Sequence, residues 1–430
     1  MTITYRVAIV LVSSLFIALP AKGFQHSRTR CLYSPTSSIE DRFGSSIDIE
    51  SGLLIIGDRN DDTAGTNAGC AWVVLHGPGG WVFLEKLIPS MQADHQAFGH
   101  AVSTDGRTVA IGSPGASNQD ELPISAGSVI VYRVQASGLH EDGNLLHPDP
   151  DSWDRFGQAV ALHGDTIAVG CPRDDTSGSD SGSVHMFRKA GGDWLHEGTL
   201  IPSDGEAHDQ FGMSVSLGSD LVIIGAPGDD DRGLDSGAAW IFRRSPEGWI
   251  PSSKIHPRQP GDFQWFGFSV TTDDQAFAIG SPLAGTTPPN HGRVDIYGIN
   301  GSKPELTRSI RSPLGSDDDW FGYSVDMSSG RLIIGSPGAD LSNLEEGCAW
   351  IVHEVSGDWH LKKVLRHGSP QAGYQSGHCV GIDGEFEAMG RYDHEDEESR
   401  PGSVCVRQAI DPEYELSSVT DDGVSSDDSR

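Results

Sequence analysis

The chain has 430 residues, and its 61 Asp and Glu against 30 Lys and Arg give a formal net charge of −31. This charge argues against a nucleic-acid or anionic-membrane surface, because both require a basic patch. The hydrophobic share is 37% and glycine contributes 54 residues, a composition that favours many short strands and tight turns over long helices.

The N-terminus has the pattern of an export signal. Arg6 precedes the apolar segment 7–19, and Ala21 and Gly23 supply small residues for cleavage. The segment is too short to span a membrane. We therefore expect residues 1–23 to be a signal peptide and the mature chain, without a membrane span, to be secreted or periplasmic. A retained N-terminal anchor is the alternative.

One pattern recurs seven times along the chain. Phe-Gly, replaced by Ser-Gly in the last copy, appears at intervals of 55 or 58 residues, and another glycine follows each Phe-Gly after 13 residues. The copies begin at Phe43, Phe98, Phe156, Phe211, Phe266, Phe321 and Ser376. Self-similarity at a fixed period is the sequence signature of a repeat architecture.

Each copy predicts four strands. In the fourth copy, residues 213–217 alternate in polarity, 221–224 form a continuous apolar run, 237–242 follow a loop rich in Gly, Pro and Asp, and a last strand opens at Trp249. A single sheet of this kind leaves two apolar faces in water, whereas seven sheets around an axis cover one another. We predict an all-β fold, a seven-bladed β-propeller of four-stranded antiparallel blades over residues 24–410. The alternative architecture is an open β-solenoid.

The two ends of the chain bear on how the ring closes. Leu32 lies 11 residues before Phe43, the same offset that the outer strands of later copies keep from their Phe-Gly. The segment around Leu32 therefore predicts the outer strand of the last blade, next to Cys405, and a Cys31–Cys405 disulfide fits that pairing. The competing outer strand is 414–419. Residues 411–430, rich in Ser and Asp, predict an acidic disordered tail. The six cysteines form no Cys-x-x-Cys pair, so the sequence offers no zinc or thioredoxin motif.

The repeated motifs resemble a known family. Phe-Gly, then an apolar residue with Gly-Ser/Ala-Pro, then Gly-x-Val/Ala is similar to the FG-GAP repeat of the integrin α N-terminal β-propeller and of many secreted microbial proteins. The resemblance covers roughly residues 30–410 and implies a seven-bladed propeller used mostly for adhesion and protein recognition. Some members bind Ca²⁺ through an Asp-x-Asp-x-Asp-Gly loop. That interval reads Gly218-Ser219-Asp220 in the fourth copy, and the motif is absent, so the family's calcium sites are not carried over.

In an antiparallel four-stranded blade, the loops between strands two and three emerge on the same side as the loops between blades. These long, acidic loops therefore lie on one face of the predicted disc, and loops on a rigid scaffold are where binding usually occurs. Asp229, Asp231 and Asp235 belong to one of the densest clusters and are the best single candidates for Ca²⁺ ligands. The alternative is that these acids serve turn formation and solubility. Ca²⁺ is the only cofactor that the sequence suggests.

Three tryptophans near Phe-Gly motifs fall on the same face, namely Trp153, Trp265 and Trp320. Exposed, they would anchor a protein or stack against a sugar. The alternative is that they pack in the wedges between blades.

Motifs for catalysis are missing, because the chain has no Gly-x-Ser-x-Gly elbow and no His-Glu-x-x-His. We therefore expect a monomeric binding and adhesion scaffold for an extracellular protein or glycan rather than an enzyme. One alternative is a carbohydrate-active hydrolase or lyase that uses carboxylates on the acidic face. Another is a structural module without a ligand of its own.

Overall fold

The computed structural model describes residues 29–36, 38, 41–90, 93–117, 124–285, 291–300, 303–391 and 402–409. The expected signal peptide (1–23) and acidic tail (411–430) lie outside these residues. Among the residues described, no helix has the length and apolar character that crossing a membrane requires.

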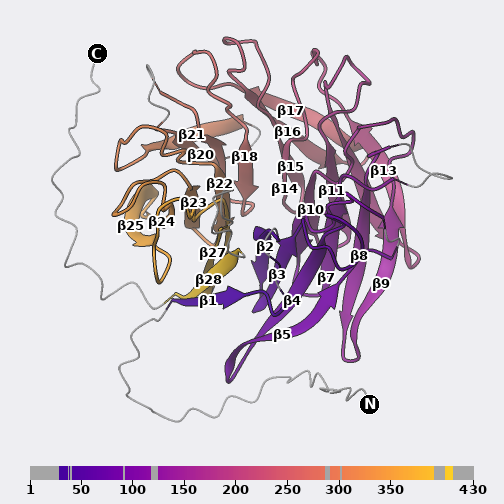
Figure 1. Cartoon of the computed structure of the whole chain (residues 1–430). Coiled ribbons are helices and arrows are strands. Elements are labelled where there is room, and N and C mark those ends of the chain that lie inside the picture. The colour runs from indigo at the N-terminus through magenta and orange to yellow at the C-terminus, as the bar shows by residue number, and fades with distance from the viewer. Residues whose placement is uncertain are drawn as a thin grey trace, which may run out of the picture.

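In the part of the chain that the structure describes, twenty-eight strands form seven four-stranded antiparallel blades in a ring, which confirms the predicted propeller (Figure 1). The strands of the first three blades are β2 (Phe43–Glu50), β3 (Leu53–Asp58), β4 (Cys70–Gly77), β5 (Gly80–Leu87); β6 (Val102–Thr104), β7 (Thr108–Ser113), β8 (Ser128–Gln135), β9 (Gly138–Leu145); β10 (Ala159–His163), β11 (Thr166–Cys171), β12 (Ser183–Ala190) and β13 (Asp193–Leu200). Blades 4 to 6 are β14 (Ser214–Leu217), β15 (Leu221–Ala226), β16 (Ala238–Ser245), β17 (Gly248–Ile255); β18 (Ser269–Thr272), β19 (Ala276–Ser281), β20 (Arg293–Asn300), β21 (Lys303–Arg311); β22 (Ser324–Ser328), β23 (Arg331–Ser336), β24 (Cys348–Val355) and β25 (Asp358–Leu365).

Blade 7 is shared by both ends of the chain. Its strands are β26 (Cys379–Ile382), β27 (Phe386–Arg391), β28 (Ser403–Gln408) and, from the N-terminus, β1 (Arg30–Tyr33). Leu32 pairs with Val404 across β1 and β28, as its offset from Phe43 predicts. In Figure 1 the indigo β1 lies beside the yellow β28. The ring is therefore closed by pairing the first described strand with the last.

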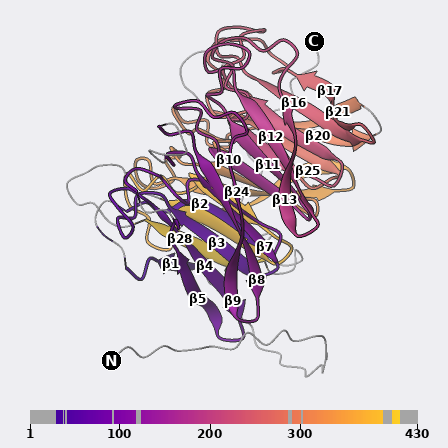
Figure 2. The same ribbon diagram turned by 90° about the vertical axis from the view of Figure 1, so that its right-hand side faces the viewer.

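The first strand of each blade in sequence, β26 in blade 7, lies at the inside of the ring. These strands contact one another in the order β2, β6, β10, β14, β18, β22, β26, and β26 contacts β2. The fourth strand of each blade lies at the outer edge, and Figure 2 shows the blades turned by 90°. This order means that the loops between strands two and three, and those between blades, emerge on one face.

The hydrophobic core is divided among the interfaces between blades. Among the described residues, each buried cluster joins two neighbouring blades; one, for example, packs Ile55 of blade 1 against Ile111 of blade 2. The second strand of most blades is buried along its whole length. Burial on both faces explains why these strands are continuous apolar runs rather than alternating ones.

Candidate binding face

The loops between strands two and three and the loops between blades emerge on one side of the ring, and together they are called the loop face. The two sets of loops contact each other across neighbouring blades. At six interfaces, the glycine that precedes the third strand of one blade bridges to the Phe-Gly position of the next, as Gly69 does with Phe98. A Cβ on Gly69 would overlap the Phe98 carbonyl oxygen, so glycine is required there. The six phenylalanines of the Phe-Gly motifs are completely buried. The loop face therefore rests on a rigid support.

On this face, two pairs of exposed apolar residues are joined through their backbones. Trp153 is 53% exposed and Ile124 is 61% exposed. The backbone N–H of Trp153 donates to the carbonyl oxygen of Ile124 over 2.8 Å. Phe263 and Leu234 repeat the arrangement at the interface of blades 4 and 5, with 50% and 51% exposure and an N–H···O distance of 2.6 Å. Each pair combines a residue three positions before Phe-Gly with a loop residue of the preceding blade.

Trp265 and Trp320 occupy a different position, one residue before Phe-Gly, and both are half-buried. The Trp265 ring stacks on Phe268 with a centroid distance of 5.6 Å and an interplanar angle of 12°. Phe268 contacts Tyr323 at 4.8 Å, and Tyr323 lies 6.2 Å from Trp320 and 4.7 Å from His378. Phe268, Tyr323 and His378 directly precede innermost strands, so an aromatic row crosses blades 5 to 7 near the ring axis.

Basic side chains surround His100, which holds the corresponding position in blade 2. Arg59 is 3.4 Å from His100, which precedes an innermost strand as Tyr323 does. Burial, followed by Arg59 and Arg155, lowers the pKa of His100 to about 3, so its imidazole is neutral. Burial and the neighbouring Arg173 lower the pKa of Arg155, and Asp180 opposes them. The loop face thus has a cationic group within a strongly acidic protein.

Two lysines pair with carboxylates of the loop face in blades 1 and 4. Lys86 on β5 lies 2.6 Å from the buried Asp61. Lys254 on β17 lies 2.7 Å from both Asp229 and Asp231. Each lysine comes from an outermost strand and reaches a loop carboxylate of its own blade. These ion pairs therefore fasten the loops to the blade.

The three residues predicted to bind Ca²⁺ do not share one centre. Asp229, Asp231 and His256 each place one ligand atom within 4.8 Å of the others. Asp235 belongs to the turn instead, since its N–H donates to the Asp230 carboxylate over 2.6 Å. His256, 25 residues after Asp231, follows the strand that carries Lys254, and only the blade register reveals that it lies here.

Asp58 is the last residue of β3 and is completely buried. Burial, then repulsion by Asp41 and Asp61, raises its pKa to about 8. Two further carboxylates, Asp48 and Asp326, lie on innermost strands and accept backbone N–H groups of the next blade. Their roles in the described structure are contacts between blades.

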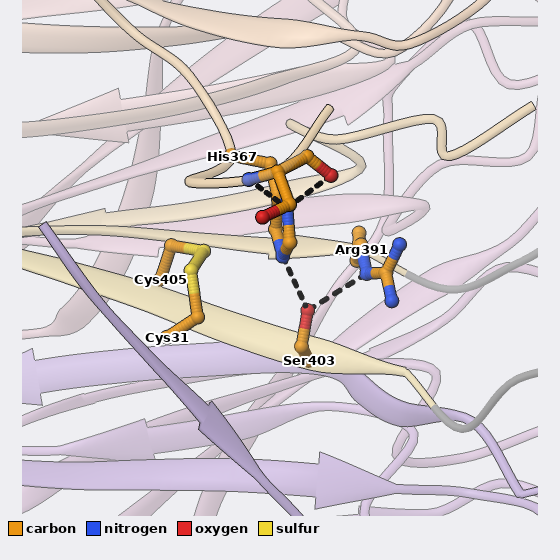
Figure 3. Close-up of a disulfide and its surroundings, with 6 residues drawn as sticks. Cys31, His367, Arg391, Ser403 and Cys405 are labelled. Atoms are coloured by element: carbon orange, nitrogen blue, oxygen red, sulfur yellow. Dashed lines mark hydrogen bonds between the residues drawn. A yellow bond between two sulfur atoms is a disulfide. The ribbon is translucent and has the colours of Figure 1, made fainter. Parts of the chain in front are cut away.

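Cys31 and Cys405 are joined by a disulfide that links β1 to β28 (Figure 3). The bond connects positions 374 residues apart. Next to it, Ser403 accepts a hydrogen bond from Arg391 Nε over 2.7 Å and lies 3.4 Å from His367 Nε2. The seam between the two ends of the chain is therefore held by strand pairing, a covalent bond and a buried polar group.

The opposite face of the ring carries short turns. A hollow of about 250 Å³ opens there among the innermost strands of blades 3 to 6, lined by Leu217, Gly218, Asp274, Ser328 and others. It has no aromatic row comparable to that of the loop face among its lining residues.

Comparison with known proteins matches the FG-GAP repeat family at residues 81–132, 140–187, 194–242 and 310–352. Each match runs from the outer strand of one blade through three strands of the next, so the sequence repeat and the blade are offset by one strand. No curated protein sequence matches the chain.

Among solved structures, the β-propeller domain of the Trilobed protease from Pyrococcus furiosus is similar over 87% of this chain and 99% of its own, with 9% identity and a TM-score of 0.49. Sqt1 of Saccharomyces cerevisiae is similar over 86% of this chain and 97% of its own, with 10% identity and a TM-score of 0.45. Likeness at this level adds nothing to what the strand order already shows.

Proposed function

Because this chain is a β-propeller of FG-GAP repeats, and hence a binding scaffold, we propose that it is an exported protein that recognises a partner protein through its loop face. The proposal of export rests on the apolar segment 7–19. The proposal of the loop face rests on one observation above all, the exposed apolar pairs Ile124–Trp153 and Leu234–Phe263.

A single exposed apolar residue is ordinary, whereas neighbouring ones on adjoining loops begin the kind of contiguous apolar patch that marks an interaction site. Trp153 and Phe263 are large aromatic side chains of the kind that anchor protein interfaces. Their backbones are fixed by hydrogen bonds to Ile124 and Leu234, so little conformational entropy is lost when a partner covers them.

The charges around the pairs indicate the chemistry of the partner. Asp62, Asp175 and Asp230 are exposed on the loops, each accepting a backbone N–H of its own turn. They add negative charge to the loops of blades 1, 3 and 4, which suits a partner surface that combines apolar side chains with Lys and Arg. A glycan fits less well, because the ring of Trp265 already stacks on Phe268.

The proposal is tested with matched pairs of substitutions. The double variant Trp153→Ser/Phe263→Ser removes both anchors, and Val82→Ser/Leu195→Ser removes two side chains of equal exposure, 53% each, from the outermost strands. Wild type and both variants are screened by interferometry against purified secreted proteins and, in parallel, on a glycan array. We expect protein ligands whose affinity falls at least 10-fold in the loop-face variant only. Ligands affected only by the outer-strand variant, or glycan ligands alone, would reject the proposal.

A further inference from the structure

At positions 147, 171, 185 and 199, which meet around Asp174, blade 3 and the loop before it differ from blades 1 and 4. Asp174 corresponds to Asp61 and Asp229, the acids that Lys86 and Lys254 neutralise. The matching lysine position in blade 3 is Thr199, which lies opposite His185 as Lys254 lies opposite Trp240. The buried Asp174 therefore lacks the ammonium that its counterparts have.

Two histidines and a cysteine surround Asp174 instead. His147 Nε2 lies 3.2 Å and His185 Nε2 3.8 Å from Asp174 Oδ2. The Cys171 sulfur completes a group in which one ligand atom from each residue lies within 4.8 Å of all the others. All four side chains are more than nine-tenths buried.

We propose that His147, Cys171, Asp174 and His185 form a binding site for a divalent transition-metal ion of the Zn²⁺ type. Two imidazoles, a thiolate and a carboxylate are a borderline-soft donor set that suits Zn²⁺ and not Ca²⁺ or Mg²⁺. In a tetrahedral zinc site, bonds of about 2.0–2.3 Å separate the ligand atoms by about 3.3–3.8 Å, close to the 3.2 and 3.8 Å between Asp174 Oδ2 and the two imidazole nitrogens.

The metal would supply the positive charge that blades 1 and 4 obtain from lysine. Binding releases the proton of the Cys171 thiol, which donates to the Asp154 carbonyl oxygen over 3.2 Å. Ser183 Oγ donates to Asp174 Oδ2 over 2.6 Å and orients the carboxylate as an outer hydrogen bond.

The location of the ligands assigns the site a structural role. His147 follows β9, the outermost strand of blade 2, whereas Cys171 ends β11 and His185 lies on β12 of blade 3. Four buried protein ligands leave no open position for a substrate, as in structural rather than catalytic zinc sites. The ion would fasten blade 2 to blade 3. Aligned positions of blade 7 carry the Cys31–Cys405 disulfide, with His367 at the place of His147.

The competing account is a metal-free hydrogen-bond network among the same side chains, in which Thr176 and Ser183 already donate to Asp174. The two accounts differ in stoichiometric metal content and in the spectrum of bound Co²⁺. The full-length mature protein, purified without chelator, is analysed for zinc by mass spectrometry. It is then stripped and titrated with Zn²⁺ or Co²⁺ while its absorption and melting temperature are recorded.

The variants use residues that other blades already carry at the same positions. Cys171→Ala copies Ala226, and His147→Pro copies Pro202. Cys348→Ser, which copies Ser183 at a buried position of blade 6, is the control. We expect one Zn²⁺ per chain, a tetrahedral Co²⁺ spectrum with a thiolate charge-transfer band, and at least 10-fold weaker Zn²⁺ binding in both blade 3 variants. The control should behave as wild type.

The proposal is overturned if folded wild type takes up no stoichiometric Zn²⁺ or Co²⁺. It is also overturned if Cys171→Ala keeps the thiolate band, or if Cys348→Ser loses it. Circular dichroism of each variant shows whether it folds, and the wild-type titration stands on its own if one does not.

Discussion

Lys254 Nζ lies 2.7 Å from the Asp229 carboxylate and 5.3 Å from the centre of the Trp240 ring. Lys86 makes the corresponding pair of contacts with Asp61 and its own cross-strand tryptophan in blade 1. In both blades a lysine of the outermost strand packs over a buried tryptophan ring and places its ammonium next to a loop carboxylate. Asp61 and Asp229 are thus balanced inside the blade, whereas Asp62, Asp175 and Asp230 remain exposed beside the apolar pairs as the charge of the loop face.

Replacing Lys254 with Met should strongly destabilise the protein. Asp229 is almost completely buried, and removing one partner of a buried ion pair costs about 3–5 kcal/mol. Urea unfolding measures the loss. The control Lys362→Met, on the exposed side of β25, should change the free energy of unfolding by less than about 0.5 kcal/mol. Equal stability of the two variants would contradict the importance of the Lys254–Asp229 pair.

Calcium at Asp229 and Asp231, if it binds, must compete with the Lys254 ammonium. We therefore expect millimolar Ca²⁺ to raise the melting temperature of Lys254→Met more than that of wild type, because the variant leaves the carboxylates without a cation. Differential scanning calorimetry with and without Ca²⁺ measures this. The double variant Lys254→Met/Asp231→Asn should lose the response. An equal response in all three proteins would place any calcium elsewhere.

The Cys31–Cys405 bond should be found by non-reducing peptide mapping, and its removal should weaken the ring. The variant Cys31→Ser should lose about 2–5 kcal/mol of unfolding free energy, because the bond fixes two ends separated by 374 residues. Cys379→Ser, which leaves the seam covalently intact, serves as the comparison. If reduction leaves the unfolding of wild type unchanged, the covalent seam adds no stability.

Asp58 should make the protein less stable as the pH rises. Its folded pKa of about 8 lies above the ordinary 3.8, so the folded state binds the extra proton between these values. The contribution is present below about pH 4 and is lost as the pH approaches 8, at up to about 1.4 kcal/mol per pH unit. Asp58→Ser, the residue that blade 2 carries as Ser113, should flatten this dependence. Parallel pH profiles of the two proteins would be evidence against a raised pKa.

The blade number and the closing strand were predictable, because a repeat interval corresponds to one sheet and Leu32 keeps the offset of an outer strand. Grouping Trp153 with Trp265 and Trp320 was less informative. Trp153 lies three residues before its Phe-Gly motif and is exposed, whereas Trp265 and Trp320 lie one residue before theirs and stack on other rings near the axis.

The group around Asp174 escapes motif searches, because its four ligands lie on four separate loops and strands. The signal was present in another form. Thr199, His185 and His147 stand in blade 3 where blade 4 or its preceding loop carries Lys254, Trp240 and Pro202. In a repeat protein, departures that coincide in one blade mark side chains that act together, but the blade register is needed to see that they meet.

The most direct test of the loop face is hydrogen–deuterium exchange on the complex with the first protein ligand found. We predict protection in peptides that contain Ile124, Trp153, Leu234 and Phe263, with little change in the outermost strands. Protection confined to the opposite face, in the turns at 272–275 and 328–329, would contradict the account.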